Sequence, residues 1–123
     1  MALTLATTMR NAIADAADTL IGTTATLEFQ TSGDVEVATL TLGNPAFGDA
    51  ATGVITLSGT PLSDTTATGG TMAKFKIKSG GTTDQITGTV GTSGQDINFP
   101  GGLTVGAGDT VTLTSFTITC PAS

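Results

Sequence analysis

The sequence predicts a mainly β protein: a small antiparallel β-sandwich, jelly-roll or immunoglobulin-like, with one N-terminal amphipathic α-helix. Three observations support this prediction. From residue 24 onward, apolar residues alternate with polar ones in short runs, and turn residues separate the runs at roughly eight- to twelve-residue intervals. Threonine and glycine account for 28 and 17 of the 123 residues, and they suit pleated strands and tight turns respectively. Helical spacing of apolar residues occurs only before residue 23.

Residues 1–22 are predicted to form a helical arm. Thr7 or Thr8 is expected to cap its start, and Gly22 to end it. We expect the apolar face of this helix either to cover the open end of the domain's own core, which is the commoner arrangement, or to dock on a neighbouring subunit. The residues of that face recur at steps of three and four: Met9, Ile13, Ala16, Ala17 and Leu20.

The remaining residues, 23–123, are expected to form the β-sandwich domain. Each strand buries one face, as the alternation of Ala25, Leu27 and Phe29 with polar neighbours indicates. Few charges or prolines protect the strand edges, so the edges are expected to be adhesive. The predicted strands lie at residues 24–30, 35–42, 54–57, 73–78, 85–90, 97–99, 103–105 and 110–120.

Two of these strands change the face on which their apolar residues lie. In 35–42 the alternation slips by one residue at 38–39, and in 110–120 it slips between Leu113 and Phe116. Because a one-residue slip turns every later side chain to the opposite face, we expect a β-bulge in each strand.

Two loops connect the predicted strands at longer intervals. Residues 44–49 form a loop with Phe47 as a buried aromatic plug, and residues 58–71 are expected to form a long exposed loop because they have almost no apolar periodicity. The turn at 91–96 is rich in oxygen ligands, but it lacks the acidic alternation of a calcium loop. We therefore expect Asp96 to cap a turn. The paired glycines are expected to form hairpin turns and not phosphate loops.

The composition lacks the usual residues of catalysis. Histidine, tryptophan and tyrosine are absent, and Cys120 is the single cysteine. Histidine is the commonest general base and metal ligand, and one cysteine allows neither an intramolecular disulfide nor a thiolate zinc site. We therefore expect no enzymatic activity, no cofactor and no tightly bound metal. Cys120 is expected to pack as a small apolar residue at a strand end.

The charge balance points to protein partners. Ten carboxylates against four cations give a formal net charge of -6, which argues against attraction to nucleic acid or to an anionic membrane surface. The N-terminal segment lacks the continuous apolar run of a signal peptide, and no apolar stretch is long enough for a membrane span. We expect a mature fold that is soluble at synthesis in a reducing cytoplasm.

Three of the four cations lie on one predicted strand face. We expect them to form either a solvated outer face, which is the commoner case, or a positive stripe that meets an acidic neighbouring subunit. Together with three residues of the helix they make up the candidate interaction surface: Met9, Ile13, Leu20, Lys74, Lys76 and Lys78.

With these features in place, the chain resembles a group of short Ala/Thr/Gly-rich structural proteins of tailed bacteriophages. Besides the N-terminal helix, three stretches carry the resemblance: 38–48 (ATLTLGNPAFG), 89–99 (TVGTSGQDINF) and 108–119 (GDTVTLTSFTIT). The resemblance implies a non-enzymatic virion component and transfers no catalytic residue.

The leading expectation is a capsid decoration or cement protein. Such a protein is made in the host cytoplasm, binds the outside of the head shell and bridges neighbouring major capsid proteins, here as a dimer or trimer. A tail-tube, baseplate or fibre-associated β-module is the alternative within the virion. A glycan-binding sandwich is the alternative of another class, and the absence of tryptophan and tyrosine disfavours it.

Overall fold

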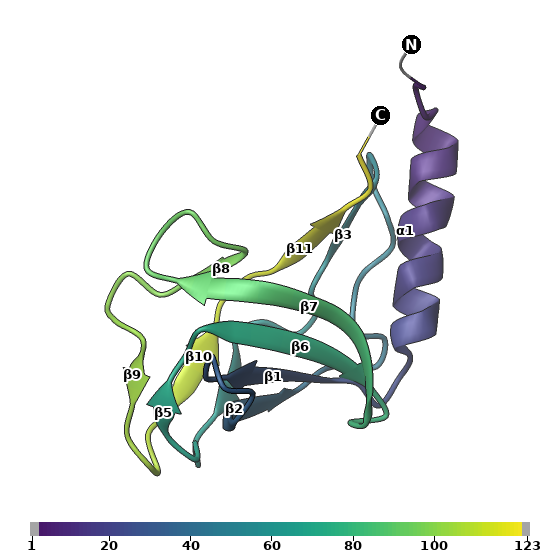
Figure 1. The fold of residues 1–123 in the computed structure, drawn as a ribbon. Coiled ribbons are helices and arrows are strands. Elements are labelled where there is room, and N and C mark those ends of the chain that lie inside the picture. The colour runs from purple at the N-terminus through teal and green to yellow at the C-terminus, as the bar shows by residue number, and fades with distance from the viewer. Residues whose placement is uncertain (1–2, 122–123) are drawn as a thin grey trace.

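The computed structural model describes residues 3–121 and confirms the predicted class: the chain is mainly β, sandwich-like, with one N-terminal helix (Figure 1). The first two residues of the predicted arm and the last two of the predicted domain lie outside the described part. The elements are α1 (Thr7–Ile21), β1 (Thr26–Gln30), β2 (Glu36–Thr41), β3 (Val54–Thr56), β4 (Leu62–Asp64), β5 (Gly70–Thr71), β6 (Lys74–Ser79), β7 (Thr83–Gly91), β8 (Ile97–Asn98), β9 (Thr104–Val105), β10 (Val111–Leu113) and β11 (Thr117–Thr119).

The largest sheet has five strands in the order β2-β1-β6-β7-β8. All neighbours are antiparallel except β7 and β8. In the β1–β6 pair Leu27 lies opposite Ile77 and Phe29 opposite Phe75, and all four side chains are buried. The period of two thus turns these residues into the apolar inner face of the sheet, as the sequence predicts.

Three small two-stranded sheets, β10–β4, β11–β3 and β5–β9, complete the described fold. Aromatic side chains connect these small sheets to the large sheet. The Phe116 ring lies 5.5 Å from the Phe75 ring, edge to face, and 6.2 Å from the Phe47 ring. Phe47 is 1% exposed, which confirms the predicted aromatic plug. Such ring pairs contribute beyond their buried area.

The predicted bulge in the second strand is confirmed, one residue earlier than expected. Phe29 pairs with Ala38 and Gln30 with Glu36, so that Val37 is the extra residue of β2. Val37 and Ala38 are both buried for this reason.

Two further predictions, one about the final strand and one about the loop 58–71, are wrong. The expected final strand is interrupted: residues 111–113 pair with β4 and residues 117–119 pair with β3, and the segment between them carries the chain from one small sheet to another. A change of partner, and not a bulge, explains the change of face. The expected long loop 58–71 contains β4 and β5, because pairing with β10 and β9 supplies the order that its own sequence lacks.

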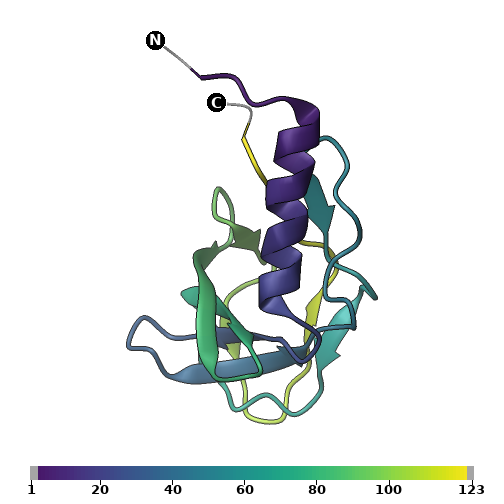
Figure 2. The same ribbon diagram turned by 90° about the vertical axis from the view of Figure 1, so that its right-hand side faces the viewer.

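The helix α1 lies beside β3 and β6 and extends beyond the sheets at its N-terminal end (Figures 1 and 2). Gly22 ends it as predicted: its φ is 83°, and its N–H donates to the Asp18 carbonyl. The predicted threonine cap is wrong. Ala6 is the N-cap residue and provides no side-chain bond, because Thr7 and Thr8 already have helical geometry.

Candidate interaction surfaces

The helix is attached to the rest of the protein mainly through its polar side. At one end, Arg10 Nε donates to the Cys120 carbonyl at 3.0 Å. Further along, three side chains bind the backbone of the loop that precedes β3, and in doing so they satisfy N–H groups that no strand pairs. Asp18 accepts from Phe47 N–H (3.1 Å), Asp15 from Ala50 N–H (2.8 Å) and Asn11 from Gly53 N–H (2.7 Å).

A short apolar contact accompanies these polar bonds. Ala14 and Ile21 are each 2% exposed, and Ala17 is half-buried against the core. These residues lie on the same side of the helix as Arg10 and Asp18, because Ala14 is four positions from both, Ala17 is seven from Arg10 and Ile21 is three from Asp18. Of the two arrangements expected for the helix, packing on its own domain is the one observed, but Ala14, Ala17 and Ile21 make that contact and Met9, Ile13 and Leu20 do not.

Instead, the predicted apolar face of the helix lies in solvent. Leu20 is 65% exposed, Met9 54% and Ile13 45%, and Ala16 between them is exposed as well. We call Met9, Ile13, Ala16 and Leu20 the helix stripe. Their spacing of four, three and four places them in one row along the helix, with no charged residue in the row.

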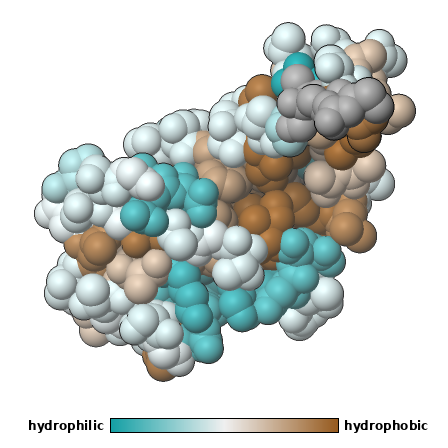
Figure 3. Space-filling model, turned by 45° about the horizontal axis from the view of Figure 1, so that its top comes forward, coloured by the Kyte–Doolittle hydropathy of each residue, from teal (hydrophilic) through white to brown (hydrophobic). Residues whose placement is uncertain are grey.

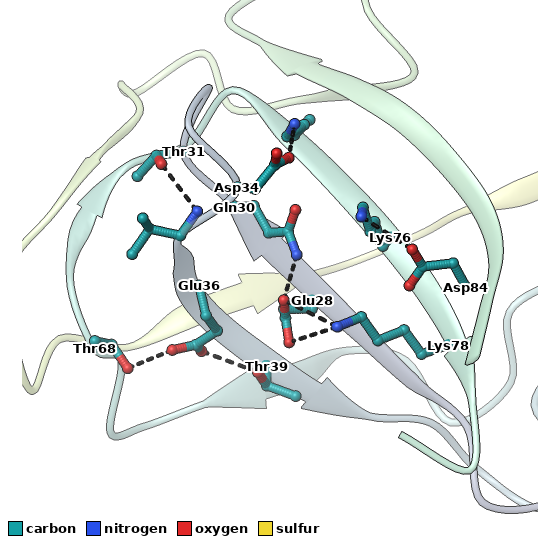
Figure 4. A network of polar contacts seen from close by, with 12 residues as sticks. Glu28, Gln30, Thr31, Asp34, Glu36, Thr39, Thr68, Lys76, Lys78 and Asp84 are labelled. Carbon is teal, nitrogen blue, oxygen red and sulfur yellow. Dashed lines mark hydrogen bonds and ion pairs between the residues drawn. The ribbon is translucent and has the colours of Figure 1, made fainter. Parts of the chain in front are cut away.

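The three predicted lysines lie together on the outer face of the large sheet, but each is paired within the chain (Figure 4). Lys74 pairs with Asp34, Lys76 with Asp84 at 3.0 Å and Lys78 with Glu28 at 3.4 Å. The neighbouring strands and turns supply these carboxylates. The three lysines therefore do not form a free positive stripe, because a carboxylate of the same chain neutralises each of them.

The charges perturb one another in the direction that this pairing requires. The hydrogen bond from Lys74 lowers the pKa of Asp34, and the hydrogen bond to Asp84 raises the pKa of Lys76. The carboxylates of Asp34 and Asp84 are exposed, and ion pairs with such a partner contribute little to stability.

On the same outer face, uncharged glutamine and threonine side chains form hydrogen bonds with glutamate carboxylates. Gln30, 3% exposed, donates its amide to Glu28, while its buried Oε1 has no protein partner. Glu36 accepts the hydroxyls of Thr39 and Thr68. Figure 4 shows this network beside the lysine pairs. Threonine hydroxyls thus solvate carboxylates here, in place of added cations.

Asp64 anchors the edge of this network. Its carboxylate accepts the backbone N–H groups of Thr39 (2.9 Å) and Thr66 (2.9 Å). These backbone bonds lower the pKa of Asp64, and the bond from Thr39 has the largest effect. The carboxylate therefore has a structural role, linking β2 to the turn after β4.

Neither a cluster of metal ligands nor a membrane-spanning helix is found among the described residues. Within residues 3–121, no group of three or more histidine, cysteine, aspartate or glutamate side chains is placed to hold a metal ion. No helix in this part of the chain is long and apolar enough to cross a membrane. Asp96 accepts the N–H of Thr89 at 2.9 Å, so it closes the loop between β7 and β8.

No family model, curated protein or solved structure matches the chain. The expected resemblance to bacteriophage structural proteins stays a prediction, and the surfaces described above carry the functional argument. Sequence periodicity identified the helix stripe but missed the four polar helix residues that bind the domain. Their signal was the polar side chains Arg10, Asn11, Asp15 and Asp18 on the side opposite the stripe.

Proposed function

We propose that this chain is a non-enzymatic structural protein of a virion, a decoration or cement protein that binds the outside of the head shell and bridges neighbouring major capsid proteins. The observation that carries the proposal is the exposed helix stripe. The opposite side of the same helix is bonded to the domain, so the stripe is held outward on a fixed support.

An exposed row of this kind favours association. Single apolar side chains on a surface are ordinary, whereas three large ones in line on one helix are typical of a contact surface. Burial in a partner's groove would stabilise the complex by about 25 cal/mol for each Å² of apolar area removed from water. The occupant that we propose is an apolar groove on the outer face of the major capsid protein.

The electrostatics support a protein partner. The chain has a net charge of -6, and its three lysines form ion pairs within the chain. A phosphate backbone would find few available cations, and an acidic protein suits the outer side of a shell better than the side facing packaged DNA. The dimer or trimer expected from the sequence belongs to the same proposal.

The mechanism of stabilisation would be mass action. A protein that binds the assembled shell but not the dissociated subunit stabilises the shell by an amount that grows with the logarithm of its free concentration over its Kd. No catalytic group is needed for this effect.

The test is reattachment of the purified protein to heads from which it has been removed, followed by heating and dilution. We expect treated heads to survive better with the protein than without it. Attachment should depend only weakly on salt, and a variant with Lys74, Lys76 and Lys78 replaced by serine should attach as well as the wild type. Equal resistance of heads with and without the protein would overturn the proposal.

A further inference from the structure

We infer that the groove between β7 and β11 accepts an extended segment of a partner protein, one with alternating apolar side chains and a lysine or arginine, by strand addition. This inference concerns a surface separate from the helix stripe. It does not depend on the virion proposal, because it rests on strand edges, the groove and its charge.

The first support is the free edge of β7. Val90 N–H donates to Ala73 on the β6 side, whereas Thr89 N–H points the other way, to Asp96. Backbone groups alternate along a strand, so Thr87, two residues before Thr89, also directs its N–H and C=O away from β6. Within the described chain, β7 pairs on this side only at Val90 and Gly91, with β8.

The second support is the free edge of β11. Phe116 C=O accepts from Leu57 N–H, and Cys120 N–H donates to Gly53 C=O, both on the β3 side. By the same alternation, Thr117 and Thr119 direct their backbone groups away from β3. In the part of the fold that the structure describes, β11 pairs with β3 alone. Unpaired edges of this kind are templates for another strand.

Between these two edges lies a groove of about 230 Å³ whose lining contains both apolar and polar side chains. Ile86, Phe116 and Ile118 line it and are half-buried, and the buried Phe75 ring lies beneath. Figure 3, in which the top of Figure 1 comes forward, shows apolar surface in the middle of the view, with hydrophilic residues along its lower border. A hollow of this volume suits one or two side chains of a peptide.

The groove continues past the start of β11. A second hollow of about 420 Å³ shares Asp96 with the first and continues along residues 112–115 to the residues before β11. The wall from Thr112 to Ile118 has seven residues. Only Thr117 and Ile118 of this wall belong to β11, so the edge itself suits a short extended segment, and the hollow beside residues 112–115 would receive the side chains that follow it.

Charge complementarity decides which partner fits. Asp96 lines both hollows, and no lysine or arginine lines either of them in the described chain. Its Oδ2 binds Thr89, while Oδ1 is not used by those bonds. A second copy of this chain is a poor source of the missing cation, because its three lysines pair with its own carboxylates and Arg10 binds the Cys120 carbonyl. The occupant that fits is therefore a different, basic chain.

The test uses the full-length protein and a display library of random nine-residue peptides, from which the strongest binders are synthesised and titrated by calorimetry. We expect the selected peptides to alternate apolar and polar residues and to carry lysine or arginine. Thr87→Pro removes the outward N–H without removing a β6 bond, so it should weaken binding at least tenfold, whereas Thr87→Ser should not.

Two further variants keep the test decisive if Thr87→Pro folds poorly, which a thermal melt would reveal. Asp96→Asn should weaken binding of the basic peptides but not of versions with lysine replaced by glutamine. Ile118→Ser should weaken both sets through the apolar lining. Failure to select any peptide, or selected peptides that bind all three variants as well as the wild type, would overturn the inference. Selection of acidic peptides would overturn the charge argument.

Discussion

The carboxylate of Asp18, in the last turn of α1, accepts a hydrogen bond from the backbone N–H of Phe47 at 3.1 Å. Phe47 belongs to the loop before β3, and its ring lies buried near Phe116. One bond therefore joins the C-terminal end of the helix to the aromatic part of the core. Together with the bonds of Arg10, Asn11 and Asp15, it explains how the helix keeps a fixed position while most of its apolar residues lie in solvent.

Replacing Asp18 by alanine should lower the free energy of unfolding by about 1–3 kcal/mol, because the N–H of Phe47 loses its partner. The measurement is urea denaturation followed by circular dichroism. Asp49→Ala, in the same loop and exposed, is the matched control and should have little effect. Equal stability of the two variants would show that water replaces the carboxylate.

Adjacent substitutions in the helix should separate folding from attachment. Ile13→Asp places a charge on a side chain that is already 45% exposed, so it should leave the thermal melt nearly unchanged while abolishing attachment to stripped heads. Ala14→Asp buries a carboxylate at a position that is 2% exposed, so it should lower the free energy of unfolding by several kcal/mol. If Ile13→Asp attaches normally, the helix stripe is not the contact surface.

An added side chain should destabilise the protein at Gly88 but not at Gly101. A Cβ on Gly88 would lie 2.4 Å from Phe75 Cε1 and 2.9 Å from Asp96 Oδ2, so that the buried ring would have to move. We expect Gly88→Ala to cost about 1–3 kcal/mol of stability. A Cβ on Gly101 meets nothing within 4 Å, and Gly101→Ala should be near neutral in the same denaturation assay.

Stability should fall in acid partly through Asp64. The Thr39 and Thr66 N–H groups hold the pKa of Asp64 below its ordinary value in the folded chain. Such a group stabilises the fold while it is ionised, and its contribution is lost as the pH falls below about 4 and through the folded pKa. Asp64→Asn should therefore show a shallower loss of stability between neutral pH and acid than the wild type. Asp49→Asn is the control, and an unchanged slope for Asp64→Asn would contradict the assignment.

Local sequence pattern predicted the elements whose environment follows from period alone. Leu27, Phe29, Phe75 and Ile77 alternate with polar residues, and they form the inner face of the large sheet for that reason. The slip in apolar parity likewise predicted the β2 bulge, because an added residue turns every later side chain of a strand to the opposite face. Composition alone also excluded an intramolecular disulfide, since the chain has a single cysteine.

What covers each face was decided by the tertiary structure. Periodicity predicted a helix with an apolar row, but a row of Met9, Ile13 and Leu20 does not state whether the chain's own core or another molecule lies against it. The answer depended on residues far along the chain: unpaired N–H groups at Phe47, Ala50 and Gly53 bind the polar side of α1 and turn the row outward. The lysines followed the same rule. Their alternation on β6 predicted an outer face, whereas their neutralisation required carboxylates that only strand pairing and turns bring near. Local spacing determines which side chains share a face, and long-range pairing determines what that face meets.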